Sequence, residues 1–240
     1  MIRFIALAAV CVLVFGASAQ ATVLADYTFG TGTVPTAVAS LSGDLAVAGM
    51  TASDIAEGPT AFSTFRYAGN NGHGQYAHGL GDPCLTLDPQ GIYTFAGAVA
   101  AGKYASFTLT ATGGVLNLSS LSFDASMRSS GGNRYAFVGD SVDGYAGAAL
   151  ATADVHTVQY INNPESGVTT NPIWLNTVVP LSGAQYQGLS SITFRLYAAD
   201  AWNGPVDFDN IIVNGEVTPE PATLALLVMG GIGMLIRRKR

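Results

Sequence analysis

The stretch SITFRLY at residues 191–197 alternates apolar and polar side chains. Successive side chains of an extended strand point to opposite faces, so its isoleucine, phenylalanine and leucine share one face and its threonine and arginine the other. The same period of two runs through YASFTLT at residues 104–110. Both stretches are therefore predicted to be half-buried β-strands with one apolar face and one more polar face.

Other parts of the chain repeat this pattern more weakly. Further strands are predicted at 23–29, 115–123, 135–138, 174–179 and 206–213, with one more near 45–49. Glycine- or proline-containing clusters, read as turns, occur at 69–74, 79–83, 113–114, 131–132 and 214–215. Many short strands, frequent turns and the lack of a clear 3.6-residue period predict an all-β fold, an antiparallel β-sandwich of jelly-roll type.

Charge and cysteine content argue against a nucleic-acid-binding protein and against a fold held by disulfides. Residues 22–218 hold five basic and fifteen acidic side chains, a net charge of −10 with histidine neutral. Such a surface repels phosphate backbones, which argues against a nucleic-acid partner. Only Cys84 remains once the N-terminal segment is removed, so the mature monomer has no intrachain disulfide. We expect one domain, residues 22–216, stabilised by core packing.

The N-terminus has the layout of an export signal. Arg3 precedes an apolar run over residues 4–16, and small residues follow at 17–21. A positive start, a short apolar core and an A-x-A site are typical of a secretory signal peptide, here residues 1–21. The expected partners are the Sec translocon and signal peptidase. A retained anchor is disfavoured because the run is shorter than a membrane span.

The C-terminus has three consecutive parts. Pro219, Glu220 and Pro221 precede residues 222–236, which carry no charge. As a helix this segment would extend about 22 Å, so we predict a single short transmembrane helix. The chain then ends in four cations, Arg237, Arg238, Lys239 and Arg240. Basic residues are retained on the cytoplasmic side, which orients the rest of the chain outward.

This order of motif, apolar helix and basic end resembles the PEP-CTERM protein-sorting signal of Gram-negative bacteria, over residues 217–240. The resemblance implies that an exosortase recognises Pro219, Glu220 and Pro221, with processing near this motif. It also implies an inner-membrane-tethered intermediate, followed by delivery to the cell surface or extracellular matrix. The alternative is a permanently tethered envelope protein whose tail is never processed.

We find no complete catalytic constellation, so the chain is predicted not to be an enzyme. Gly139-Asp140-Ser141 resembles the nucleophile block of GDS-type esterases, but the Asp-x-x-His pair that activates such a serine is missing. The expected structure there is a strand that runs into a turn. A secreted carbohydrate-active enzyme of sandwich fold remains the alternative, since paired carboxylates are present.

Two kinds of binding residue stand out. Asp207, Asp209 and Asn210 offer hard oxygen ligands, and the two aspartates share one strand face, so calcium is the one cofactor predicted here. Trp202 lies in a polar, turn-rich loop, where an aromatic ring suits contact with the apolar face of a sugar. We therefore expect an exported structural or adhesive protein that binds exopolysaccharide.

Overall fold

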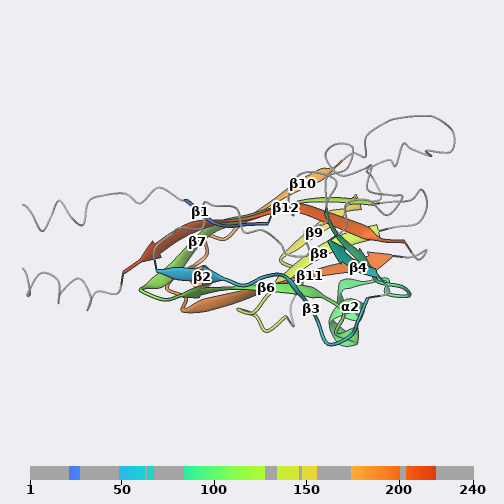
Figure 1. The fold of residues 1–240 in the computed structure, drawn as a ribbon, viewed down its shortest axis with the longest axis horizontal. Helices are drawn as coiled ribbons and strands as arrows, with labels where there is room; N and C mark the ends of the chain where they lie inside the picture. Colours follow the sequence, from blue (N-terminus) through green and yellow to red (C-terminus); the bar gives the residue numbers. More distant parts are fainter. Residues whose placement is uncertain are drawn as a thin grey trace, which may run out of the picture.

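The computed structural model describes residues 22–27, 49–62, 64–67, 84–127, 134–145, 148–155, 174–200 and 204–219. They form an antiparallel β-sandwich, which confirms the predicted fold class (Figure 1). The predicted signal peptide at residues 1–21 lies outside the described residues and stays a prediction.

Two six-stranded sheets make up the sandwich. The first sheet consists of β1 (Thr22–Tyr27), β4 (Thr64–Tyr67), β5 (Leu85–Asp88), β7 (Val115–Met127), β10 (Leu175–Pro180) and β12 (Val206–Thr218). The second sheet consists of β2 (Met50–Ala52), β3 (Ala56–Glu57), β6 (Ala105–Ala111), β8 (Arg134–Asp140), β9 (Ala151–Asp154) and β11 (Ser191–Asp200). Between β5 and β12 the chain changes sheet at every connection except the β8–β9 hairpin, as in a jelly roll.

The long strands β7, β12, β6 and β11 lie inside their sheets. The first sheet runs β10-β7-β12-β5-β4, and β1 shares with β5 the same edge of the 13-residue strand β12. The second sheet runs β2-β6-β11-β8-β9, and β3 shares with β2 one edge of β6. The strands predicted at 104–110 and 191–197 are therefore the adjacent central strands β6 and β11.

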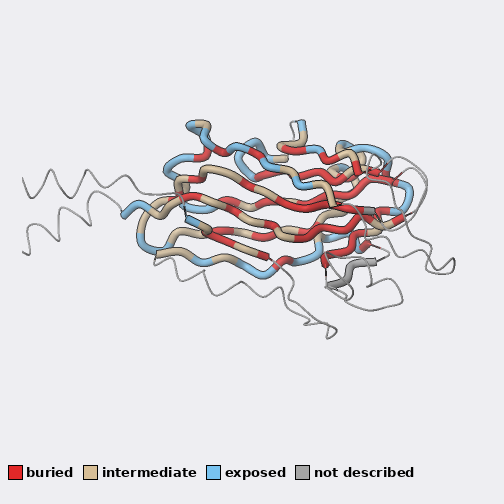
Figure 2. The backbone as a smooth tube through the Cα atoms, turned by 90° about the horizontal axis from the view of Figure 1, so that it is seen from above, coloured by how far each residue is buried: buried red, intermediate tan, exposed pale blue. Residues whose placement is uncertain are grey.

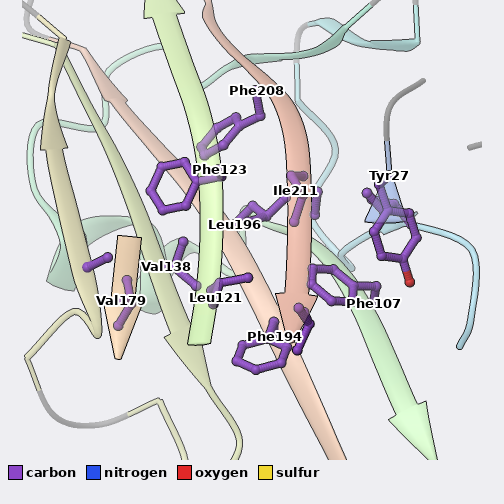
Figure 3. Close-up of a cluster of buried hydrophobic side chains, with 14 of the residues drawn as sticks. Tyr27, Phe107, Leu121, Phe123, Val138, Val179, Phe194, Leu196, Phe208 and Ile211 are labelled. Carbon is purple, nitrogen blue, oxygen red and sulfur yellow. The ribbon is translucent and has the colours of Figure 1, made fainter. Parts of the chain in front are cut away.

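The core lies between the inner faces of the two sheets (Figure 3). Tyr27 of the first sheet packs against Phe107 of the second, with 4.7 Å between ring centroids, and so bridges the layers. Within the second sheet, Phe107 lies 5.4 Å from Phe194 on the neighbouring strand. Phe123 and Phe208, on neighbouring strands of the first sheet, lie 5.7 Å apart. Buried residues run along the central strands and exposed ones gather at the connections (Figure 2). Burial alternates along β6, as a strand with one inward face requires.

One helix was not predicted. Helix α2 (Phe95–Ala101) begins after Thr94, whose hydroxyl accepts a hydrogen bond from the Gly97 amide, and ends at Gly102 in the left-handed conformation. It packs on the outer face of the second sheet through a separate apolar cluster. The buried members of that cluster are Ile92, Ala98, Phe137, Tyr197 and Ala199.

The turn predicted at residues 214–215 is wrong. Strand β12 passes through both residues and stays paired with β7 up to Thr218. The register shifts between Asn214 and Gly215, and a Cβ atom at Gly215 would overlap the carbonyl oxygen of Asn117. Glycine is therefore used here for close strand approach at a bulge rather than for chain reversal.

Other predicted turns and strands are confirmed or lie outside the described residues. Gly113 and Gly114 connect β6 to β7, as expected. Strands β7, β8, β10 and β12 occupy the predicted places, and β7, β8 and β12 run further than predicted. The clusters at 69–74, 79–83 and 131–132, and most of the strand predicted near 45–49, are not among the described residues.

A buried ion pair joins the two strands next to the final loop. Arg134, at the start of β8, lies opposite Asp200 at the end of β11, with 3.3 Å between Nε and Oδ1. Arg134 is 2% exposed and Asp200 is fully buried. Gly204 lies against the guanidinium so closely that a Cβ atom there would overlap it. The pair therefore fixes the point where the chain re-enters the first sheet.

Both ends of the sandwich domain leave at the same end of the molecule. Thr22 pairs with Gly215, and Thr218 pairs with Val115, so β1 begins beside the place where β12 ends (Figure 1). Val206, where β12 begins, lies at the opposite end of this strand and pairs with Leu87 of β5.

Candidate functional site

The C-terminal edge of the sandwich leads directly into the predicted sorting tail. Strand β12 ends at Thr218, and Pro219 follows it in an exposed position. A Cβ atom at Gly114 would overlap the carbonyl group of Thr218 and press on Pro219. The chain is thus held by the sheet up to the residue before the Pro-Glu-Pro motif.

A stack of one cation and two aromatic rings lies on the outer face of the second sheet. The Arg195 guanidinium carbon lies 3.9 Å from the ring centroid of Tyr104 and 3.6 Å from that of Tyr145. All three residues are half-buried. Tyr145 adopts a left-handed backbone conformation and its hydroxyl donates to the Thr193 carbonyl oxygen at 3.3 Å, which holds its ring over the strand.

Arg195 has no acidic partner in the described part of the chain, where its contacts are with aromatic rings. Its Nε atom and the hydroxyl of Tyr197 are both buried, and the Arg195 and Tyr197 side chains interact with each other. Burial raises the pKa of Tyr145 and of Tyr197, and the nearby Arg195 charge opposes the rise in both. The guanidinium is therefore positioned by stacking and not by an ion pair.

Hydroxyl side chains extend from this stack across the same face. Thr108 and Thr193 face each other on β6 and β11, with 2.8 Å between their hydroxyl oxygens. Ser106 lies opposite Arg195, and Thr110 lies opposite Ser191. Each of these residues is at least partly exposed. The outward positions 106, 108, 110, 191, 193 and 195 thus carry five hydroxyls, one guanidinium and no carboxylate.

The outer face of the first sheet carries the residues predicted to bind calcium. Asp207 and Asp209 do share a face of β12, and both are 4% exposed. The Thr86 hydroxyl donates to Asp207 at 2.7 Å, and the backbone N–H of Asn210 donates to the Asp209 side chain at 2.8 Å. Asn210 lies at a bulge with φ +47°, and its side-chain nitrogen donates to Asp124.

Asp207 and Asp209, which were predicted to bind calcium, thus accept hydrogen bonds from protein donors. Asp124, which pairs with Asp209 across β7 and β12, also accepts a hydrogen bond from Asn176. Among the described residues, no three His, Cys, Asp or Glu side chains are arranged to hold a metal ion. Calcium binding at Asp207, Asp209 and Asn210 therefore stays a prediction.

The string Gly139-Asp140-Ser141 forms the predicted strand end and turn. Strand β8 ends at Asp140, and residues 141–145 form turns. The Ser141 hydroxyl accepts a hydrogen bond from the Thr193 amide at 3.0 Å. Asp140 accepts from the Val142 amide at 2.7 Å and from the Tyr186 hydroxyl at 2.9 Å. The described contacts of both polar side chains thus support the turn and its attachment to neighbouring segments.

Tyr186→Phe should remove an alkaline loss of stability. Burial, followed by the hydrogen bond to Asp140, raises the pKa of Tyr186 to about 12. The folded state favours the neutral phenol, so this contribution is complete below pH ~10 and is lost between pH ~10 and the folded value. The variant should unfold about 1–3 kcal/mol more easily at pH 8, because the Asp140 oxygen loses its donor.

The measurement is urea unfolding of both proteins at pH 8, 10 and 11.5. The difference in unfolding free energy between the two proteins should shrink as pH rises, because only the wild type has a Tyr186 hydroxyl that can ionise. A difference that is constant across this range would contradict the assignment.

The aromatic residues Tyr145, Tyr186, Tyr197 and Trp202 differ in whether they could reach a sugar. Tyr186 and Tyr197 are buried and serve packing. Tyr145 is half-buried in the stack with Arg195, a role that its place in the turn after β8 did not reveal. Trp202 lies outside the described residues, so its predicted glycan contact stays a prediction.

Comparison with known proteins assigns the tail. Residues 217–240 match the family model described as the PEP-CTERM protein-sorting motif. The tail is a PEP-CTERM sorting motif. A motif of this kind indicates an exported protein that an exosortase sorts to the cell surface. Val217 and Thr218, the first two residues of the PEP-CTERM motif, are also the last two of β12.

Comparison with curated protein sequences found no match. Among solved structures, the K3 cleaved adhesin domain of Lys-gingipain from Porphyromonas gingivalis is similar, with 13% identity and a TM-score of 0.40 over 81% of this chain and 99% of that one. The mannan-recognising module TmCBM27 has 12% identity and a TM-score of 0.40, over 83% and 100%. The xylan-binding module CBM15 has 13% identity and a TM-score of 0.38, over 72% of this chain and 92% of that one. Likenesses this low say nothing about what the present chain binds.

The rest of the PEP-CTERM region is not among the described residues. These positions are Glu220, Pro221, the segment 222–236, Arg237, Arg238, Lys239 and Arg240. In the described ranges no helix is long and apolar enough to cross a membrane. The predicted transmembrane helix, tethered intermediate and basic anchor stay predictions.

Proposed function

We propose that this exported protein is an adhesive component of the cell surface or extracellular matrix that binds exopolysaccharide through its sandwich domain. The observation that carries the proposal is the overlap at Val217 and Thr218, where a PEP-CTERM motif begins inside the last strand of the sandwich. A protein delivered by this motif displays the whole sandwich outside the inner membrane.

The positions of the chain ends support this arrangement. The N-terminal strand begins beside Gly215, so the export signal and the sorting tail connect to the same end of the domain. The opposite end and both sheet faces are then free of the membrane connection. An acidic domain with a net charge of −10 favours neutral polymers over anionic ones as partners.

The test is retention of the protein in the matrix of its own host. The full-length protein should co-sediment with the matrix in wild-type cells, and most of it should appear in the medium of a strain that makes no exopolysaccharide. Equal retention in both strains would contradict polysaccharide binding. A host without exosortase serves as the control for sorting, since there the protein should stay with the membrane fraction.

A carbohydrate-active enzyme is the alternative. Incubation of the purified protein with host exopolysaccharide should release no new reducing ends. Release that requires a carboxylate such as Asp207 would replace the adhesive proposal with a hydrolytic one.

A further inference from the structure

We infer that the polysaccharide site is the outward face of β6 and β11, where Arg195 is clamped between Tyr104 and Tyr145, and that its ligand is a neutral polysaccharide. This rests on the proposed function and specifies where binding occurs. The surface consists of this stack and the hydroxyl side chains Ser106, Thr108, Thr110, Ser191 and Thr193, and is called the hydroxyl face below.

The first step is the state of the guanidinium. Arg195 has five N–H donors and no acidic partner in the described ranges; its Nε is buried beside Tyr197, which leaves the terminal N–H groups as the donors for a ligand. Rings at 3.9 and 3.6 Å hold the group flat and limit its rotation. A donor fixed in place before binding loses less conformational entropy when a ligand arrives. Arg195 is half-buried as a residue, and a guanidinium held in this way offers its terminal N–H groups as a preset fork to adjacent sugar hydroxyls.

The second step is the extent of the hydroxyl face. Cross-strand partners Ser106 and Arg195, Thr108 and Thr193, and Thr110 and Ser191 make three rows, about 6.8 Å apart along the strands. The face lies on the part of the second sheet beside the cluster covered by α2. Three rows of donors and acceptors on a rigid sheet suit an extended polymer better than a single small molecule.

The third step is the charge of the ligand. The six outward positions on β6 and β11 hold no carboxylate, so a sugar chain meets hydroxyls and one guanidinium. The domain around them has a net charge of −10, which opposes the approach of a long anionic polymer. A neutral polysaccharide accepts hydrogen bonds from Arg195 without this repulsion.

The chain offers matched variants for a test. Arg195→Met keeps the apolar stem and removes the donors, and the pair Thr108→Val with Thr193→Val removes two hydroxyls without changing side-chain size. Thr152→Val is the control, because Thr152 is an exposed threonine on the edge strand β9, away from the hydroxyl face. Thermal unfolding of each variant checks that the fold is kept.

Affinity electrophoresis of the full chain in mild detergent measures binding to host exopolysaccharide, glucomannan, xylan and polygalacturonate. We expect wild type and Thr152→Val to be retarded equally by at least one neutral polysaccharide. Arg195→Met and the double valine variant should each bind about tenfold or more weakly, from the loss of two or more hydrogen bonds.

The outcomes separate this inference from the proposed function. If the wild type is retarded by none of the polysaccharides, the proposed function itself is overturned. If the wild type is retarded and both folded variants bind as tightly, polysaccharide binding stands and the hydroxyl face is not its site. Retardation by polygalacturonate alone would overturn the assignment of a neutral ligand.

Discussion

Replacing Arg134 with alanine should lower the free energy of unfolding by about 3–5 kcal/mol, the cost of breaking a buried ion pair. The Asp200 carboxylate is fully buried 3.3 Å from the Arg134 Nε atom and would lose this countercharge. The variant would also leave a void against Gly204, on which the guanidinium packs. Urea unfolding of the full chain in mild detergent, followed by tryptophan fluorescence, measures the change.

Two controls make the result specific. Removing both charges together, with Arg134→Met and Asp200→Leu, should restore much of the lost stability, since no buried charge is then left alone. Asp54→Asn removes an exposed charge and should change stability by no more than about 0.5 kcal/mol. A loss below about 1 kcal/mol for Arg134→Ala would show that the pair does not stabilise the fold.

Phe208→Ala should cost about 3–5 kcal/mol, because it opens a cavity between the sheets. The ring is fully buried and lies 5.7 Å from that of Phe123 on the neighbouring strand. Tyr93→Ala is the matched aromatic control, since Tyr93 is 61% exposed and should tolerate truncation with a change of about 0.5 kcal/mol or less. Equal effects of the two substitutions would contradict the assigned core.

The fold could be predicted from the sequence wherever one strand face is apolar and the other is polar. Strands β6 and β11 satisfy this condition, and both were predicted within three residues at each end. Strand β12 was cut short in the prediction because Asn-Gly at 214–215 is a common turn sequence. A bulge and a close approach to Asn117 use the same residues inside a continuous strand.

Helix α2 could not be predicted from the local sequence pattern. Its seven residues make too few turns to display a 3.6-residue period, although Thr94 and Gly102 are typical capping residues. Its stability comes from packing on the sheet. That contact joins residues far apart in the chain, such as Ala98 and Phe137, and no local pattern reveals it.

The PEP-CTERM motif and the proposed binding face also differ in how far the sequence reveals them. The PEP-CTERM motif is contiguous, so it was identified from the order of residues alone. The stack on Arg195 takes Tyr104 from the loop before β6 and Tyr145 from the turn after β8. Alternation placed Arg195 on a polar face, but strand register and the left-handed conformation of Tyr145 bring the rings to it.

The most direct test of the central claim is the intact mass of the protein recovered from the surface and medium of its host, compared with a strain that lacks the exosortase. We predict a mature chain that has lost residues up to Ala19 or Ala21 and is cut near Pro219, and an uncut C-terminus in the deletion strain. A chain that extends to Arg240 in both strains would contradict exosortase processing and indicate a permanently tethered protein.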